Sequence, residues 1–149
     1  MKKIICFIFV IFLVGCGKKE YVTCDININN EIDNYNMSGR YIIYYDGNYV
    51  TEIKKEENYI SSDEAVIEFF DESKNLEYYN LNDIYGGVTY SIKRNDNSIN
   101  LTATIDMKQV DIKRMINNDY INSDYVVSNK LSLTGAKNIY ESKGAKCDI

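Results

Sequence analysis

Alternation of apolar and polar residues marks the first folded segment of the chain. Over residues 21–29 every second residue is apolar, and the apolar positions are Val22, Cys24, Ile26 and Ile28. Successive side chains of a β-strand point to opposite faces, so a period of two predicts a strand with one buried face.

Two further runs rich in β-formers, residues 41–45 and 49–54, flank the sequence Asp46-Gly47. A type I′ turn needs positive φ at both of its central residues, and Asp-Gly is a favoured pair there. The two runs are therefore predicted to pair as an antiparallel hairpin.

A second hairpin is predicted over residues 88–105. Val88, Tyr90 and Ile92 share one face, and residues 95–98 supply a polar turn. The returning strand keeps its apolar residues on that same face. These residues are Ile99, Leu101, Ala103 and Ile105.

Helical spacing follows the first hairpin. Ser61 and Glu64 match a capping box, in which each residue satisfies a backbone N–H group of the first turn. Apolar residues then recur at helical intervals, which predicts a helix over residues 62–78. They are Val66, Phe69, Phe70 and Leu76.

The C-terminal part of the chain predicts a helix over residues 132–143, ended by Gly144. Residues 110–116 indicate a short helix or turn, and residues 117–129 are polar enough for a loop. The order strand, hairpin, helix, hairpin, helix favours the α+β class. We expect an antiparallel sheet of about five strands with the helices packed on one face.

The N-terminus has the parts of a bacterial export signal. Lys2 and Lys3 precede an uninterrupted apolar run over residues 4–14. That run is shorter than the roughly 20 residues of a membrane-spanning helix. Residues 13–16, Leu-Val-Gly-Cys, resemble the lipobox of bacterial lipoproteins. The resemblance implies a diacylglyceryl group on Cys16 and cleavage just before it.

This interpretation divides the chain into a signal peptide (residues 1–15), a lipidated cysteine with a short tether (residues 16–20) and one α+β domain (residues 21–149). Two acyl chains attach a protein stably to a membrane, so we expect it on the extracytoplasmic face of the cell membrane. The alternatives are an ordinary signal peptide and an uncleaved anchor.

Two cysteines remain beyond the proposed anchor, Cys24 in the first strand and Cys147 near the C-terminus. An exported location is not kept reduced, which favours a disulfide between them. Closing so long a loop stabilises a domain by roughly 4 to 5 kcal/mol in the chain-entropy model. The alternative is two separate buried thiols.

The amino-acid composition limits the partners and catalytic groups that can be expected. The chain has 17 basic and 22 acidic residues, a net charge of −5, and it lacks the basic clusters that nucleic acid requires. It has no histidine, which is the usual general base near neutral pH and the commonest zinc ligand. We expect no nucleic-acid partner, no metal, no cofactor and no catalytic residue.

Four short segments resemble the YehR-type bacterial lipoproteins, a family of unknown function. They are residues 44–50 with the Asp-Gly turn, residues 86–90 (Gly-Gly-Val-Thr-Tyr), residues 104–107 (Thr-Ile-Asp-Met) and residues 110–112 (Val-Asp-Ile). The resemblance covers residues 41–115 and implies an exported α+β domain. It supplies no catalytic residues.

Two functions stay open. The first, which we favour, is a non-enzymatic binding module for a small ligand or a surface protein. The 14 tyrosines suit recognition surfaces, although packing in the sheet explains them as well. Pairs that could line a groove are Tyr44-Tyr45 and Tyr78-Tyr79.

The alternative is a carboxylate-dependent cell-wall hydrolase, which needs an acid and a base at a fixed separation. Its candidate carboxylates come from two places in the chain. They are Asp71, Glu72, Asp106 and Asp111. Their positions at helix faces and strand ends fit solvated charges better than a catalytic pair.

Overall fold

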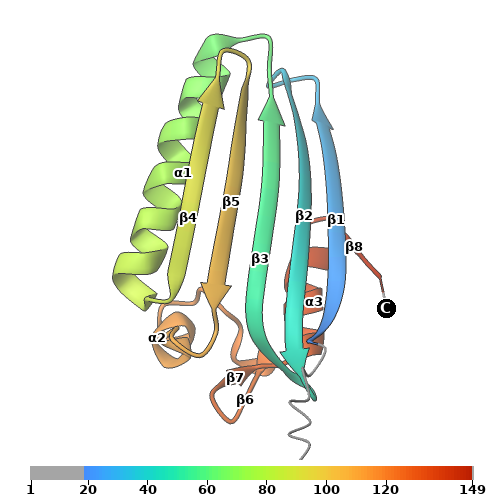
Figure 1. Ribbon diagram of the computed structural model, residues 1–149, viewed down its shortest axis with the longest axis vertical. Helices are drawn as coiled ribbons and strands as arrows, with labels where there is room; N and C mark the ends of the chain where they lie inside the picture. The colour runs from blue at the N-terminus through green and yellow to red at the C-terminus, as the bar shows by residue number, and fades with distance from the viewer. Residues whose placement is uncertain (1–18, 149) are drawn as a thin grey trace, which may run out of the picture.

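A six-stranded antiparallel sheet forms the centre of the computed structural model, which describes residues 19–148 (Figure 1). The strand order is β4-β5-β3-β2-β1-β8. The predicted signal peptide (residues 1–15) and Cys16 lie outside the described residues. The strands are β1 (Glu20–Asn30), β2 (Tyr35–Asp46), β3 (Tyr49–Ile60), β4 (Val88–Asn95), β5 (Ser98–Asp106) and β8 (Lys146–Cys147).

Both predicted hairpins are present. Asp46 pairs with Tyr49, so the central residues of the turn between β2 and β3 are Gly47 and Asn48. Only Gly47 has a positive φ, of +58°, so the predicted type I′ turn centred on Asp46-Gly47 is wrong although the hairpin itself is present. These two strands are longer than predicted, because polar residues extend them at the end away from the turn. On β3 the core-facing positions include Lys55 and Glu57, so the apolar alternation breaks although the strand continues.

Helix α1 (Glu64–Tyr85) runs farther than the predicted residues 62–78 and begins differently. The side chain of Asp63 accepts a hydrogen bond from the backbone N–H of Ala65, so Asp63 is the N-cap. The predicted capping box of Ser61 and Glu64 is therefore wrong. The Ser61 hydroxyl instead accepts from the Asp63 N–H group and donates to the carbonyl of Asn34.

The predicted apolar face of α1 is also wrong in part. Phe69 and Leu76 are more than half exposed, at 63% and 61%. The inward face is built largely from tyrosines, whose hydroxyl makes them weak signals in a hydrophobic pattern. The buried residues are Ile67, Tyr78, Leu81 and Tyr85.

The two later helices form where they were predicted. They are α2 (Ile112–Asn117) and α3 (Leu133–Glu141), and Ser132 caps α3 by accepting from the N–H of Gly135. The predicted end of α3 at Gly144 is wrong, because Ser142 is its C-cap. The predicted loop between them contains a 3₁₀ turn, η1 (Ser123–Tyr125), and the short strands β6 (Val126–Val127) and β7 (Lys130–Leu131).

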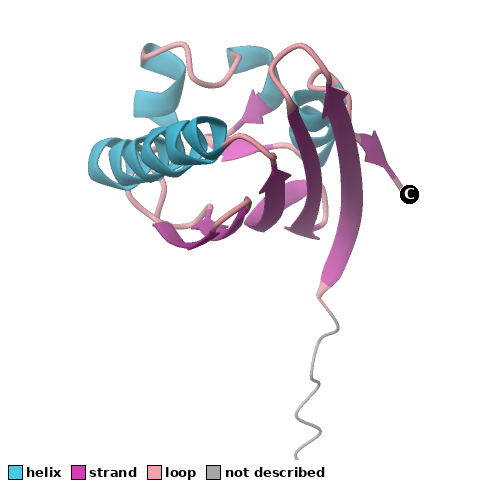
Figure 2. Ribbon diagram, turned by 90° about the horizontal axis from the view of Figure 1, so that it is seen from above, coloured by secondary structure: helices cyan, strands magenta, loops and turns pink. Residues whose placement is uncertain are grey.

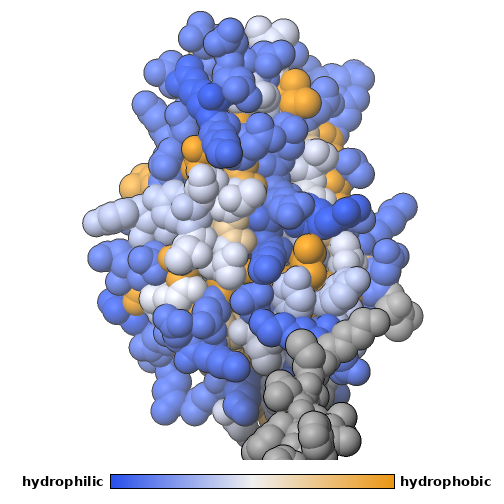
Figure 3. Space-filling view, in the orientation of Figure 1, coloured by the Kyte–Doolittle hydropathy of each residue, from blue (hydrophilic) through white to orange (hydrophobic). Residues whose placement is uncertain are grey.

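All the helices lie on one side of the sheet, as predicted for the α+β class (Figure 2). Helix α1 packs against β3, β4 and β5, whereas α3 packs against β1, β2 and β3. The opposite face is mainly hydrophilic (Figure 3), with Arg40, Glu56 and Thr102 exposed on it. Among residues 19–148, no helix combines the length and apolar character needed to cross a membrane.

The predicted disulfide joins Cys24 to Cys147, with their Cα atoms 3.9 Å apart. The two cysteines are also register partners in the pairing of β1 with β8. This pairing adds a sixth strand to the roughly five that the sequence predicted. A strand of two residues has no periodicity to detect, so the pattern along the chain did not reveal it.

Candidate functional site

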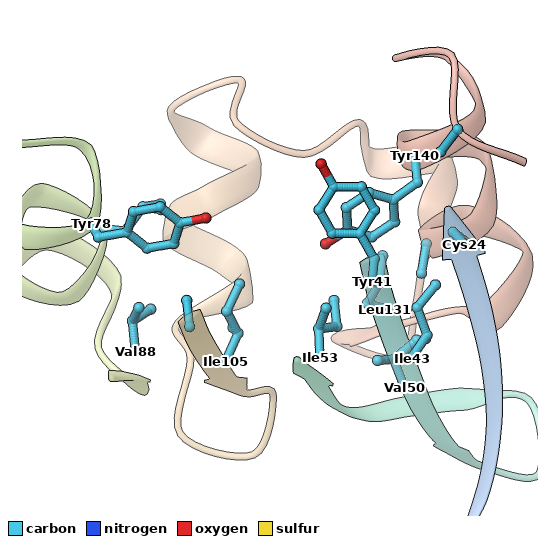
Figure 4. Packing of buried hydrophobic residues seen from close by; sticks show 14 of the residues in the cluster. Cys24, Tyr41, Ile43, Val50, Ile53, Tyr78, Val88, Ile105, Leu131 and Tyr140 are labelled. Carbon is cyan, nitrogen blue, oxygen red and sulfur yellow. The ribbon is translucent and has the colours of Figure 1, made fainter. Parts of the chain in front are cut away.

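A cavity of about 410 Å³ lies on the helix-covered face of the sheet, between α1 and α3. Its floor is formed by Ile53 and Lys55 of β3 and by Ile105 of β5. Figure 4 looks into this region, with Tyr78 on one side and Tyr41 and Tyr140 on the other. The volume falls within the range of small-molecule sites, roughly 300–1,000 Å³.

One end of the cavity carries its charged groups. Lys55 lies two residues along β3 from Ile53, and the charges of Glu77 and Lys143 both act on its ammonium. Glu77 projects from α1, and Lys143 follows the last turn of α3. The three charged residues that line the cavity are therefore grouped together.

The other end is apolar. Met107 lies beyond Ile53, because its backbone N–H donates to the carbonyl of Thr51. Leu131 lies in the same direction, because the next residue, Ser132, bridges to Tyr49 at the start of β3. Both side chains line the cavity, together with Met115 and Ile121. Aliphatic and thioether groups thus enclose this end.

Lys55 is the unusual residue of the site. It is only 8% exposed, and within residues 19–148 its ammonium forms no hydrogen bond or salt bridge. Its Nζ atom instead lies among three tyrosine rings. The distances to the ring centroids are 5.5 Å for Tyr78, 5.8 Å for Tyr140 and 6.0 Å for Tyr41. The negative faces of such rings attract a cation by about 0.5 to 2 kcal/mol each.

Burial lowers the pKa of Lys55, because the ammonium loses its hydration shell, and the negative charge of Glu57 opposes this effect. Lys143 and Lys74 lower it further through like-charge repulsion, and Glu77 partly offsets them. The protonated form of Lys55 is therefore held in the site at a free-energy cost.

The nearest buried carboxylate, Glu57, already has partners. Its two oxygens accept hydrogen bonds from Tyr41, at 3.1 Å, and from Tyr59, at 2.8 Å. Hydrogen bonds to a charged acceptor are stronger than neutral ones, so they hold the carboxylate in place. Glu57 does not approach Lys55 within salt-bridge distance.

Glu77 is also paired. Its carboxylate forms a salt bridge of 2.7 Å with Lys74, three residues earlier on α1. This contact offsets the charge of Glu77, which is the only acidic residue among the described residues that line the cavity. The charged end of the cavity is left with two cations, Lys55 and Lys143.

Tyrosine packing fixes the shape of the charged end. The Tyr41 ring stacks on Tyr140 with centroids 4.3 Å apart, which joins β2 to α3. Tyr78 faces this pair from α1, with its hydroxyl pointing across the core (Figure 4). Within the described residues that hydroxyl is buried without a hydrogen-bond partner. Burial raises the pKa of both Tyr78 and Tyr140 well above the ordinary value.

The carboxylates considered for hydrolysis have local roles. Asp71 lies 3.9 Å from Arg94, and Asp111 caps α2. Asp106 closes the turn after β5, where it accepts from the N–H of Lys108. None of them, nor Glu72, lines the cavity between α1 and α3. Over residues 19–148 no group of three or more Cys, Asp or Glu side chains is placed to hold a metal ion.

The two tyrosine pairs that were suggested to line a groove do not form a groove together. Tyr78 is in the core beside Lys55, whereas Tyr79 is 61% exposed. Sequence reasoning missed Lys55 and Glu57, because it ended the strand at residue 54. The available signal was the spacing of Ile53 and Tyr59, which are in phase with each other across the two charged residues.

Comparison with known proteins shows the fold alone. No family model matches the chain, and no curated protein matches it. The NMR structure of the Escherichia coli YehR protein is similar, with a TM-score of 0.56 and 19% sequence identity over 87% of this chain and 91% of that chain. An NMR structure of a protein from Streptococcus pneumoniae TIGR4 gives a TM-score of 0.47 and 12% identity over 99% and 98%. The expected likeness to YehR is therefore present at the level of the fold.

Proposed function

We propose that the protein is a lipid-anchored, extracytoplasmic binding module that holds a small ligand in the cavity between α1 and α3. One observation supports this most strongly. The cavity is mainly apolar, yet the largely buried residue Lys55 lies in its floor, and its ammonium has no carboxylate partner in the described part of the chain. A few convergent polar groups in an apolar pocket are typical of ligand sites.

The proposed anchor is consistent with the position of the cavity. Strand β1 begins at Glu20, four residues after Cys16, and each residue spans at most about 3.5 Å. Glu20 pairs with Tyr45, which in turn pairs with Val50 at the start of β3. The apolar end of the cavity lies toward that same end of the sheet, so it would face the membrane to which Cys16 is attached.

A binding module is better supported than the hydrolase. Of the carboxylates within residues 19–148, only Glu77 lines the cavity, and it is bound to Lys74. A glycosidase requires two carboxyl groups that face each other across the scissile bond. The arrangement offers apolar enclosure and positive charge, which are suited to retaining a ligand.

Calorimetric titration of the mature protein with short-chain amphiphiles tests ligand binding. The probes are decanoate, decanol and decyltrimethylammonium, each below its micelle concentration. Ala136 lies fully buried in the wall formed by α3, so Ala136→Leu should weaken binding by about tenfold or more through overpacking. Thr134→Leu, exposed on the same helix, is the matched control and should bind as the wild type does.

A second variant separates loss of the site from loss of folding. Ile139 is half-buried at the cavity wall, and Ile139→Phe narrows the cavity with less disturbance of the core than Ala136→Leu. Binding of no probe at all would overturn the proposal. Undiminished affinity in both folded cavity variants would place the ligand elsewhere.

The anchor has its own experiment. In cells that make the full chain, the wild-type protein should sediment with membranes, and a Cys16→Ala variant should be lost from that fraction. Mass spectrometry of the mature N-terminus should find a diacylglyceryl group on the Cys16 sulfur, with two ester-linked acyl chains on its glyceryl part. An unmodified Cys16 thiol in the membrane-bound protein would contradict lipid anchoring.

A further inference from the structure

We propose that the ligand is an amphipathic anion, with its charged head beside Lys55 and an aliphatic body directed toward Met107 and Leu131. This inference rests on the proposed binding function and specifies its ligand class. The two ends of the cavity differ in chemistry, and the ligand class follows from that difference.

Among the described residues, no carboxylate at the charged end forms a salt bridge with Lys55. An ammonium that is largely shielded from water without a carboxylate or phosphate partner is held at a free-energy cost. Glu57 is occupied by two tyrosine hydroxyls, and Glu77 by Lys74. An anionic head entering the cavity would supply the partner that the described residues do not give Lys55.

A second cation strengthens the preference for negative charge. Lys143 lines the cavity at its charged end and repels the ammonium of Lys55. An anion placed near both lysines would reduce this repulsion, whereas a cationic head would add a third like charge. A neutral head would leave the repulsion unchanged. Charge complementarity therefore selects the anion among ligands of equal apolar area.

The apolar end favours a flexible aliphatic body. Met107 and Met115 have unbranched, polarisable side chains, which adapt to ligands of irregular shape. Ile121 and Leu131 complete this end with aliphatic surface, and both are buried. A single alkyl chain can follow such a lining, because its own torsions adjust to the space.

The position of the cavity agrees with a ligand drawn from a lipid surface. Its apolar end lies toward the end of the sheet where β1 begins, next to the proposed tether. The head could be a carboxylate, as in a free fatty acid, or a phosphate, as in a lipid headgroup. Both share the chemistry that Lys55 would recognise, namely a compact anion on an alkyl chain.

Calorimetric titration of the mature protein with matched ten-carbon probes tests this inference. The wild type should bind decanoate or decyl phosphate about tenfold or more tightly than decanol, and should bind decyltrimethylammonium most weakly. The preferred anion identifies the source, either a free carboxylate or a phosphate headgroup. Preference for either one supports the inference.

Two variants test whether Lys55 causes the preference for an anionic head. Lys55→Met keeps the length of the side chain and removes its charge, so the anion affinity should fall about tenfold or more to the level of decanol. Decanol binding should remain, which shows that the variant is folded. Lys54→Met is the matched control, because Lys54 is the neighbouring residue of β3 on the open face. It should retain the wild-type preference.

The outcomes separate this inference from the function on which it rests. Equal binding of decanol and both anions to the wild type, or preference for the cation, would overturn the ligand class and leave a binding module. An anion preference that survives in Lys55→Met would overturn the role of Lys55. Binding of no probe would overturn both proposals.

Discussion

The Nζ atom of Lys55 lies 5.5 Å from the centroid of the Tyr78 ring, and this contact joins the middle of β3 to α1. The Tyr78 hydroxyl is buried and, within residues 19–148, has no hydrogen-bond partner. A charge and a hydroxyl that are both unpaired are rare in a protein core. Unpaired polar groups lower stability, and natural proteins retain them mainly where function requires them.

Lys55→Met should therefore stabilise the unliganded protein. Methionine fills a similar space without a desolvated charge, so the free energy of unfolding should rise by about 1 to 2 kcal/mol. Urea unfolding at neutral pH measures the change. Lys54→Met, on the exposed face of the same strand, should stay within about 0.5 kcal/mol of the wild type. A clear loss of stability in Lys55→Met would contradict an unpaired ammonium.

Two tyrosine-to-phenylalanine substitutions should have opposite effects. Tyr59→Phe removes a hydrogen bond of 2.8 Å to the buried Glu57 and should lower stability by about 1 to 3 kcal/mol. Tyr78→Phe removes a hydroxyl that has no partner and retains the ring beside Lys55. It should be neutral or stabilising by about 1 kcal/mol. Urea unfolding of the two variants in parallel checks the difference, and equal losses would contradict it.

Alkaline pH should destabilise the protein through its buried tyrosines. Burial raises the pKa of Tyr78 and Tyr140 above the ordinary value of 10.0, so the unfolded chain loses these protons first. Their contribution to stability is complete below pH 10.0 and is lost as the pH rises above it. Tyrosinate absorbance should show most of the buried rings ionising together with unfolding. Ionisation of all tyrosines near pH 10 in the folded state would contradict this.

Lys55 should make stability rise with pH, at pH values below those at which the buried tyrosines make it fall. Burial lowers its pKa from 10.5, so below pH 10.5 the unfolded state binds more protons than the folded state. The contribution of Lys55 to stability therefore rises with pH from its lowered pKa up to about 10.5. Lys55→Met should remove this rise from the wild-type profile of unfolding free energy against pH. An identical profile in both proteins would show that Lys55 is not desolvated.

Loss of the disulfide should lower the free energy of unfolding more than any of the single substitutions above. The disulfide joins residues 123 positions apart and fixes β8 against the first strand. Reduction, or the double substitution Cys24→Ala and Cys147→Ala, should lower the unfolding free energy by about 4 to 5 kcal/mol in the chain-entropy model. An unchanged urea midpoint after verified reduction would contradict this.

The hairpins and the helix-covered sheet were predictable from the chain, because their signals are local. Asp46 and Gly47 specify a turn, and the alternation around Val88 and Ile105 specifies one buried face. The disulfide was also predictable from the sequence, because Cys24 and Cys147 had few other possible partners once export was inferred.

The candidate site was not predictable, because its residues violate the hydrophobic pattern on which such reasoning depends. Lys55 and Glu57 occupy core positions, and their charges ended the apparent strand. Their environment exists only when Tyr78 of α1 and Tyr140 of α3 meet over β3. That contact depends on tertiary packing, which periodicity along the chain does not encode.

The most direct test of the ligand site is methyl NMR of the mature protein titrated with decanoate. Ile105, Leu131 and Ala136 line the cavity and should show the largest shifts, while Ile42 on the open face of the sheet should not move. In Lys55→Met these shifts should require a clearly higher decanoate concentration. Shifts centred on the open face, or no shifts at saturating decanoate, would contradict a ligand site between α1 and α3.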